Sequence, residues 1–141
     1  MDVEKIINDY MGEIGPSTAM LLFGKTARIR SFLVKSFQKA KIFFATEYIE
    51  QAVPKLKESD VFCYDTFAQT MKGESEMIVI DQINELAGRY ASQCFLGKSI
   101  LAHLRLGHHV VLVGEGSMDD IEELIVFMKT HNLLTLHQWM E

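Results

Sequence analysis

The sequence is poor in cysteine, which excludes whole classes of protein. Its 141 residues include only two, Cys63 and Cys94, and these lack the close spacing of a zinc site or of a disulfide framework. Because both lie among apolar residues, we interpret them as buried free thiols. A reducing, cytoplasmic location is therefore expected.

Long hydrophobic runs are also missing. No apolar run approaches the ~20 residues that a membrane-spanning helix requires. A secretory signal is not expected either, because Asp2 and Glu4 stand where its basic region and apolar core would begin. Apolar residues nevertheless make up 48% of the chain, which is enough for a full core. We expect a folded protein with no membrane span.

Positive charge is scarce outside the N-terminal part of the chain. Residues 1–41 hold seven Lys or Arg against four Asp or Glu, whereas residues 42–141 hold seven against fifteen. Since nucleic-acid binding needs a basic face, no nucleic-acid partner is expected. The basic stretch 25–41 is typical of the solvated face of an amphipathic helix. Its alternative role is to dock an acidic protein partner or the acidic body of the same chain.

Helical and strand patterns alternate along the sequence. Apolar spacing predicts helices over 3–11, 18–38, 49–59, 67–75, 91–106 and 117–132. Stretches rich in β-formers predict strands over 41–48, 60–66, 76–81, 108–116 and 133–139. Such alternation requires a parallel sheet with helices on both faces. The predicted fold is therefore α/β, a five-stranded, mostly parallel, doubly wound sheet in residues 41–141, preceded by an α-helical segment in residues 1–40.

Acidic residues follow several predicted strands. Glu47, Asp65 and Asp81 each come near the end of one strand, and the carboxyl ends of parallel strands meet at one edge of the sheet. Carboxylate oxygens at that edge could hold Mg²⁺. The alternative is that these residues are simply the points at which strands become polar. No other cofactor is predicted.

Residues 41–139 resemble a receiver domain of bacterial two-component signalling, in the order of elements, in VFCYDTFAQTM at 61–71 and in MIVID at 77–81. The resemblance implies that Asp81 is the phosphoryl-accepting residue. Several family positions differ: the first strand ends on Ala45-Thr46-Glu47, Gly114 stands near the expected Thr or Ser, and LLTLHQW lacks the expected Lys. The resemblance therefore implies a response-regulator-like signal-transduction module that binds a protein partner or itself as a homodimer, and neither a complete phospho-switch nor an enzyme.

Two alternatives remain open. From Ile78 onward the chain is also similar to STAS domains of the anti-sigma-factor-antagonist type, which would make Ser92 a regulatory serine. The other alternative is a small nucleotide-binding α/β enzyme. Gly114, Gly116 and Ser117 precede a predicted helix, and glycine backbone with helix amides can bind an anion there. The LGKS sequence at 96–99 is not a P-loop, because the required glycine five positions earlier is absent and the stretch lies inside a predicted helix.

Overall fold

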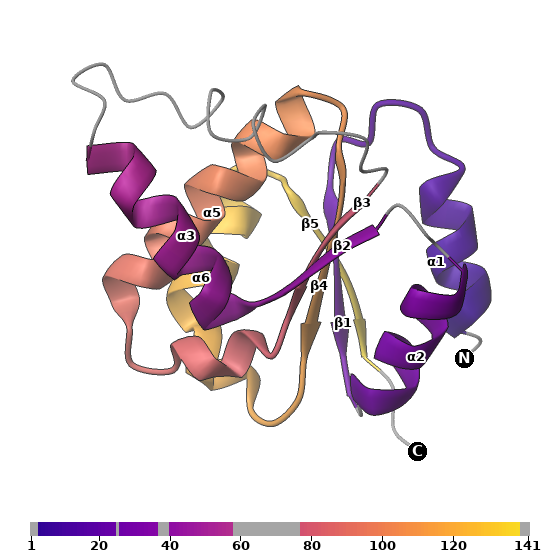
Figure 1. Cartoon of the computed structure of the whole chain (residues 1–141), viewed down its shortest axis with the longest axis horizontal. Helices are drawn as coiled ribbons and strands as arrows, with labels where there is room; N and C mark the ends of the chain where they lie inside the picture. The colour runs from indigo at the N-terminus through magenta and orange to yellow at the C-terminus, as the bar shows by residue number, and fades with distance from the viewer. Residues whose placement is uncertain (1–2, 25, 37–39, 58–76, 139–141) are drawn as a thin grey trace.

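The computed structural model describes residues 3–24, 26–36, 40–57 and 77–138 (Figure 1). The strand predicted over 60–66 and the helix predicted over 67–75, with Cys63 and Asp65, lie outside the described residues. The helices are α1 Val3–Met11, α2 Thr26–Ser36, α3 Ala45–Lys57, α5 Tyr90–Arg105 and α6 Glu122–Thr130, with short 3-10 turns η1 Ile83–Leu86 and η2 Met118–Ile121. The strands are β1 Ala19–Phe23, β2 Ala40–Phe44, β3 Met77–Asp81, β4 His109–Gly114 and β5 Leu134–Gln138.

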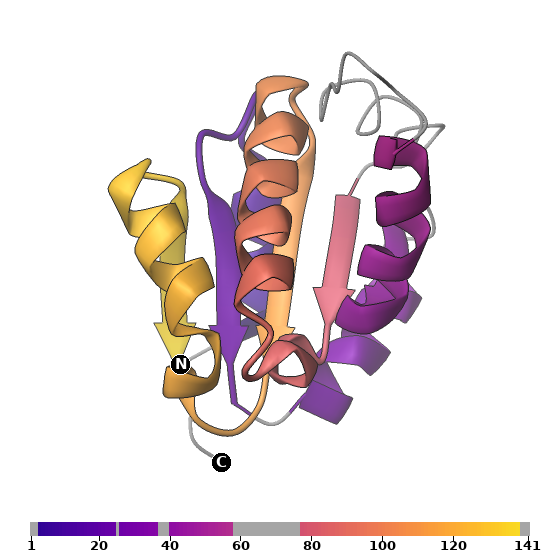
Figure 2. The same ribbon diagram turned by 90° about the vertical axis from the view of Figure 1, so that its left-hand side faces the viewer.

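The five strands form one parallel sheet in the order β2-β3-β4-β1-β5. Every neighbouring pair is parallel, so the carboxyl ends of all strands lie along one edge of the sheet (Figure 2). This confirms the predicted five-stranded, doubly wound α/β class. None of the described helices is long and apolar enough to cross a lipid bilayer.

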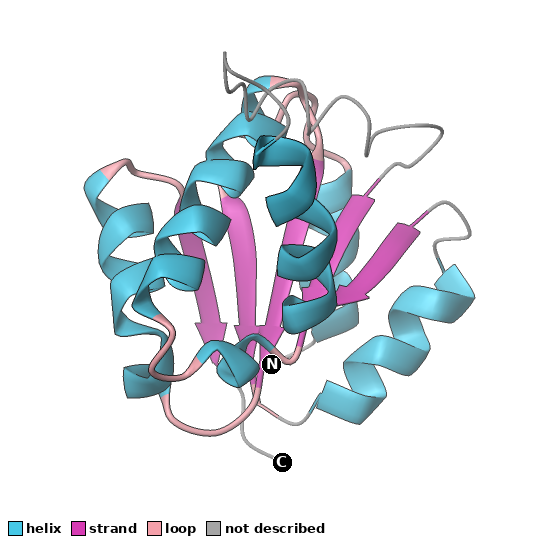
Figure 3. Cartoon of the chain, turned by 60° about the vertical axis from the view of Figure 1, so that its left-hand side comes forward, coloured by secondary structure: helices cyan, strands magenta, loops and turns pink. Residues whose placement is uncertain are grey.

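Helices cover both faces of the sheet. Helices α3, α5 and α6 lie against one face, which we call the three-helix face, and α1 and α2 lie against the other, the two-helix face (Figures 1 and 3). Because side chains alternate along a strand, each central strand feeds both cores. Leu21 of β1 joins the core under the three-helix face, whereas its neighbour Leu22 joins the core under the two-helix face.

The helix predicted over residues 18–38 is wrong. Residues Ala19–Phe23 form β1, and the helix α2 begins only at Thr26. Every residue of β1 is buried, as expected for a strand with neighbours on both edges and helices on both faces. A run of five apolar residues can be either such a strand or part of a buried helix, and periodicity alone does not distinguish them.

The remaining described elements follow the prediction with shifted ends. The strand expected to continue to residue 48 ends at Phe44, because Ala45, Tyr48 and Ala52 form the buried side of α3 and follow helical spacing. The helix expected over 117–132 begins with the 3-10 turn η2. Strand β1, from the first 40 residues, lies between β4 and β5, while the division into domains at residue 40 stays a prediction.

Candidate functional site

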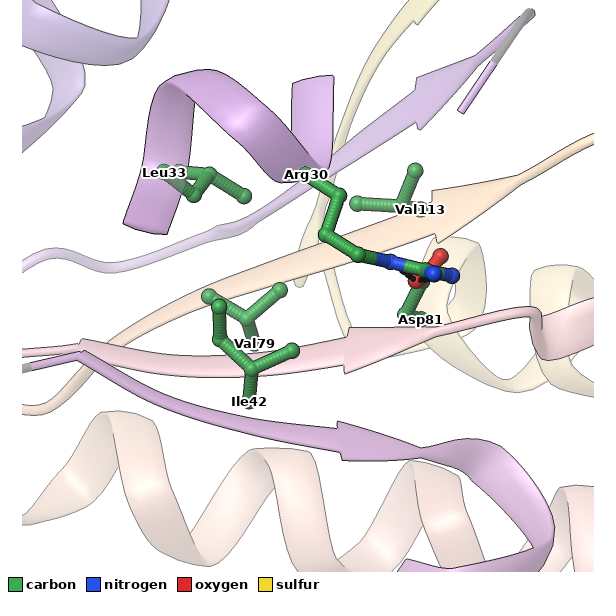
Figure 4. Close-up of a pocket in the computed structure, with 6 residues that line it drawn as sticks. All are labelled: Arg30, Leu33, Ile42, Val79, Asp81 and Val113. Carbon is green, nitrogen blue, oxygen red and sulfur yellow. Dashed lines mark hydrogen bonds and ion pairs between the residues drawn. The ribbon is translucent and has the colours of Figure 1, made fainter. Parts of the chain in front are cut away.

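Asp81 ends strand β3 at the carboxyl edge of the sheet and is almost fully buried, with 1% of its surface exposed. It follows Val79 on the two-helix face, where Arg30 of α2 approaches it (Figure 4). Arg30 Nε donates a hydrogen bond of 2.6 Å to Asp81 Oδ2, and a terminal guanidinium nitrogen makes an ion pair with the same oxygen. The backbone N–H of Gln82 donates to Asp81 Oδ1 over 2.8 Å. Both carboxylate oxygens therefore have donors within the chain.

The surroundings hold the Arg30 side chain in place. Leu33, Ile42, Val79 and Val113 line the space between α2 and the sheet, which leaves no room for a water molecule (Figure 4). The guanidinium carbon of Arg30 lies 5.0 Å from the ring centre of Phe44, within cation–π distance. The ion pair is thus packed on its inner side, while the Arg30 side chain remains 39% exposed at the rim.

The proposed magnesium ligands are only partly described. Glu47 is exposed in the first turn of α3, and Asp65 lies outside the described residues. Within 3–24, 26–36, 40–57 and 77–138, no three His, Cys, Asp or Glu side chains come together as a metal site. Metal binding that uses Asp65, and phosphoryl acceptance at Asp81, stay predictions.

The predicted anion site lies in the loop after β4. Asn84 of η1 reaches this loop: its Oδ1 accepts from the Glu115 N–H over 3.0 Å, and its Nδ2 donates to the Ser117 carbonyl over 2.9 Å. Ser117 Oγ accepts from the Asp119 N–H. A side chain at Gly114 would come within 2.6 Å of the Phe23 ring, so glycine here serves close packing. Anion binding by Gly114, Gly116 and Ser117 stays a prediction, and the Glu115 and Asp119 N–H groups already have acceptors.

Ser92, the regulatory residue implied by the STAS resemblance, lies in the first turn of α5 and is partly exposed. Its regulatory role stays a prediction. Cys94, on the same helix, is a free and half-buried thiol.

The sequence reasoning missed the tripeptide Gly24-Lys25-Thr26. Gly24 directly follows strand β1, and Thr26 is the first residue of helix α2. The last three residues of a P-loop likewise stand at the start of the helix that follows a strand. The earlier glycine of that motif is absent, since position 19 is an alanine inside β1. Gly24 N–H instead donates to the Gly114 carbonyl over 3.0 Å, so β1 and β4 stay joined at the rim. An apolar run followed by Gly-Lys-Thr was the available signal.

Comparisons with known proteins support a fold and no family. No protein-family model and no curated protein matches the sequence. DnaA from Aquifex aeolicus bound to AMPPCP is similar in structure, with a TM-score of 0.62 and 11% identity over 94% of this chain and 44% of that chain. Domain III of the Thermotoga maritima replication initiation protein DnaA gives a TM-score of 0.61 and 13% identity, over 95% of this chain and 60% of that chain.

A replication initiator DnaA bound to AMPPCP and single-stranded DNA gives a TM-score of 0.63 and 11% identity, over 96% of this chain and 45% of that chain. The chain thus spans less than half the length of the two nucleotide-bound DnaA chains. At these identities the likeness shows the fold alone.

The interpretation as a receiver domain of signal transduction is wrong. The structural neighbours are DnaA replication initiators rather than response regulators. The strand order agrees: in the receiver-type order the first strand lies between the second and third, whereas here β2 and β3 are direct neighbours. The small nucleotide-binding α/β alternative fits these findings better.

Proposed function

We propose that this chain is a nucleotide-binding α/β domain that holds the phosphates of an adenine nucleotide at the start of α2 and does not hydrolyse the nucleotide. The observation that carries the proposal is the sequence Gly-Lys-Thr at 24–26, in which Gly24 follows β1 at the carboxyl edge of the sheet and Thr26 is the first residue of α2. In open α/β sheets, ligands bind at this edge. Two of the structurally similar DnaA proteins are bound to AMPPCP, an analogue of ATP.

The chemistry of this segment suits phosphate. The first backbone N–H groups of a helix have no acceptor within the helix, and the helix dipole favours an anion there. In the sequence, Lys25 precedes the first helical residue and Thr26 is that residue, so the segment contains a positive charge and a hydroxyl donor. Because the glycine-rich lead-in is absent, no loop wraps around the terminal phosphates. We therefore expect binding without turnover, and weaker binding than a complete P-loop gives.

The test is nucleotide titration with a matched pair of variants. Binding of a fluorescent ADP or AMPPCP would be followed by anisotropy, and phosphate release from ATP by a coupled assay. Lys25→Ala should weaken binding by about tenfold or more, since a hydrogen bond to a charged group contributes roughly 1.5–3 kcal/mol. Lys98→Ala is the control, because Lys98 is an exposed lysine in the Gly97-Lys98-Ser99 stretch inside α5.

Three results would reject the proposal. They are the absence of nucleotide binding at millimolar concentration, equal losses in Lys25→Ala and Lys98→Ala, and phosphate release that depends on Lys25.

Single-stranded DNA is a second candidate ligand. The stretch 25–41 holds six Lys or Arg and no Asp or Glu, and a similar DnaA protein is bound to single-stranded DNA. Of the described residues in this stretch, Lys35 is exposed on α2. A labelled oligothymidine should show binding that weakens steeply with salt, and Lys35→Ala should reduce the salt slope by about one. Binding that is absent at low salt would reject this candidate and restore the expectation of no nucleic-acid partner.

A further inference from the structure

P-loop NTPases hold Mg²⁺ with an Asp at the end of a strand and the Ser or Thr of the loop. The residues at the corresponding places in this chain are Asp81 and Thr26. Mg²⁺ requires near-octahedral oxygen ligands and keeps several bound waters. Asp81 fits that requirement poorly, because two Arg30 nitrogens are directed at Oδ2, the Gln82 N–H donates to Oδ1, the residue is almost fully buried, and the lined space next to it does not admit water. Asp81 therefore does not fit a hydrated magnesium ion.

We propose that Arg30 takes the place of a divalent cation at Asp81. Its guanidinium supplies the positive charge that the buried carboxylate requires, with two nitrogens directed at Asp81 Oδ2. The domain therefore needs no divalent cation at Asp81 to fold. It also binds its nucleotide without Mg²⁺, and this second consequence rests on the proposed function.

Several contacts make arginine suited to this position. The guanidinium remains charged at all ordinary pH values and offers donors in a planar fork, which the compact ammonium of lysine does not. Its central carbon lies over the Phe44 ring, which favours a delocalised cation. Arg30 lines the space between α2 and the sheet together with the apolar residues Leu33, Val79 and Val113 (Figure 4). Arg30 is thereby held over Asp81 without any ligand.

The residue after Asp81 contributes to the same arrangement. Gln82 has a φ of 57°, in the left-handed region that residues other than glycine seldom adopt. This backbone turn accompanies the hydrogen bond from its N–H to Asp81 Oδ1. A cation at Oδ1 would share an oxygen that already accepts this bond, and a cation at Oδ2 would meet the Arg30 guanidinium.

Manganese is the probe for the test, because Mn²⁺ replaces Mg²⁺ at oxygen sites and its paramagnetic resonance signal reports the free ion. The full chain should show no Mn²⁺ binding that depends on Asp81, and its Tm should be the same in MgCl₂ and in EDTA. Mn²⁺ binding to the wild-type chain that is lost in Asp81→Asn would overturn the proposal, whatever the other variants do.

Arg30→Gln is the variant in which Mn²⁺ binding should appear. Removing the guanidinium should lower the Tm and expose an unpaired carboxylate, so that Mn²⁺ binds at least tenfold more tightly than to the wild-type chain and raises the Tm of the variant. Arg30→Gln combined with Asp81→Asn should recover the Tm and lose the Mn²⁺ response. A folded Arg30→Gln with unchanged Tm and no Mn²⁺ binding would contradict the proposal.

Nucleotide titrations separate this inference from the proposed function. AMPPCP should bind the wild-type chain with the same Kd in MgCl₂ and in EDTA. If AMPPCP binds in neither buffer, the proposed function fails while the Mn²⁺ result still decides the role of Arg30. If AMPPCP binds only in MgCl₂, the proposed nucleotide binding is supported, and the proposal that Arg30 replaces the metal ion is rejected.

Discussion

The two faces of the sheet bury ionisable side chains in opposite ways. On the three-helix face, a hydrogen-bonded row joins Tyr48 of α3, His103 of α5 and His108, which precedes β4. On the two-helix face, Asp81 is paired with Arg30. His108, at one end of the row, directly precedes the start of β4, whereas the ion pair lies at the carboxyl edge of the sheet.

The histidine row has the character of an uncharged structural network. The Tyr48 hydroxyl and His103 Nε2 are 2.8 Å apart, and the Nδ1 atoms of His103 and His108 are 2.9 Å apart. Burial, together with the neighbouring His108, lowers the pKa of His103 from 6.5 to about 3. Burial likewise raises the pKa of Tyr48. Tyr48 and His103 are therefore neutral near pH 7.

The difference shows where the molecule maintains charge. A buried charge without a partner is expensive, so a side chain must become neutral or acquire a counter-ion. In the interior, His103 and Tyr48 of the histidine row are neutral. Asp81 instead has a counter-ion, Arg30, at the edge where ligands bind in open α/β sheets. The ion pair therefore keeps a buried charge paired at the rim, whereas the row joins polar side chains in the interior.

The largest expected effect concerns the cores of the two faces. Leu33 of α2 and Leu124 of α6 are both fully buried, one on each face. Leu33→Ala and Leu124→Ala should each lower the free energy of unfolding by about 3 kcal/mol, within the usual 2–5 kcal/mol for buried leucine. Urea denaturation followed by circular dichroism would measure both. A small loss or a separate transition in Leu33→Ala would mean that residues 1–40 fold apart from the sheet, as the predicted division implies.

The next largest effect is a loss of stability in acid. His103 has a pKa of 6.5 when unfolded and about 3 when folded, so between these values the unfolded chain binds an extra proton. Stability should fall as the pH falls through this window, by about 1.4 kcal/mol per pH unit and roughly 2 kcal/mol between pH 7 and pH 5. Denaturation curves at several pH values would measure it.

Two variants isolate the His103 contribution. His103→Gln should flatten the slope between pH 7 and pH 5. His131→Gln should leave it intact, because His131 is exposed after α6. Equal slopes in the wild-type chain and in His103→Gln would contradict the description of the row as a buried neutral network.

The smallest effect concerns the rim on the three-helix side. Asn84→Ala removes the side-chain hydrogen bonds that join η1 to the loop after β4. Because these bonds are partly exposed, we expect a loss of about 1 kcal/mol. Hydrogen exchange should also show faster opening at the Glu115 N–H. Asn8→Ala, on the exposed side of α1, is the control, and equal losses in the two variants would show that the bonds to Asn84 add nothing.

Parts of the site could be read from local sequence and parts could not. MIVID gave both strand β3 and its terminal aspartate, because the apolar run and its polar stop are adjacent in the chain. Arg30 was invisible as a partner, because it lies 51 positions from Asp81 and was placed on a helix expected to be solvated. The sequence reasoning also missed Gly24-Lys25-Thr26. The tripeptide resembles the end of a P-loop only if a strand precedes it, and the residues before it were predicted to be helical.

The sequence by itself determined the fold class. Strands with apolar residues on both faces, alternating with helices, leave a covered parallel sheet as the arrangement that buries them, and β3, β4 and β5 follow from that pattern. Only the tertiary structure decided that Ala19–Phe23 is a strand and that it lies between β4 and β5. It also decided that the helix after this strand brings an arginine to Asp81. The physical reason is that strand pairing and ion pairing depend on distances through space, which residues far apart in the chain acquire only once the core has formed.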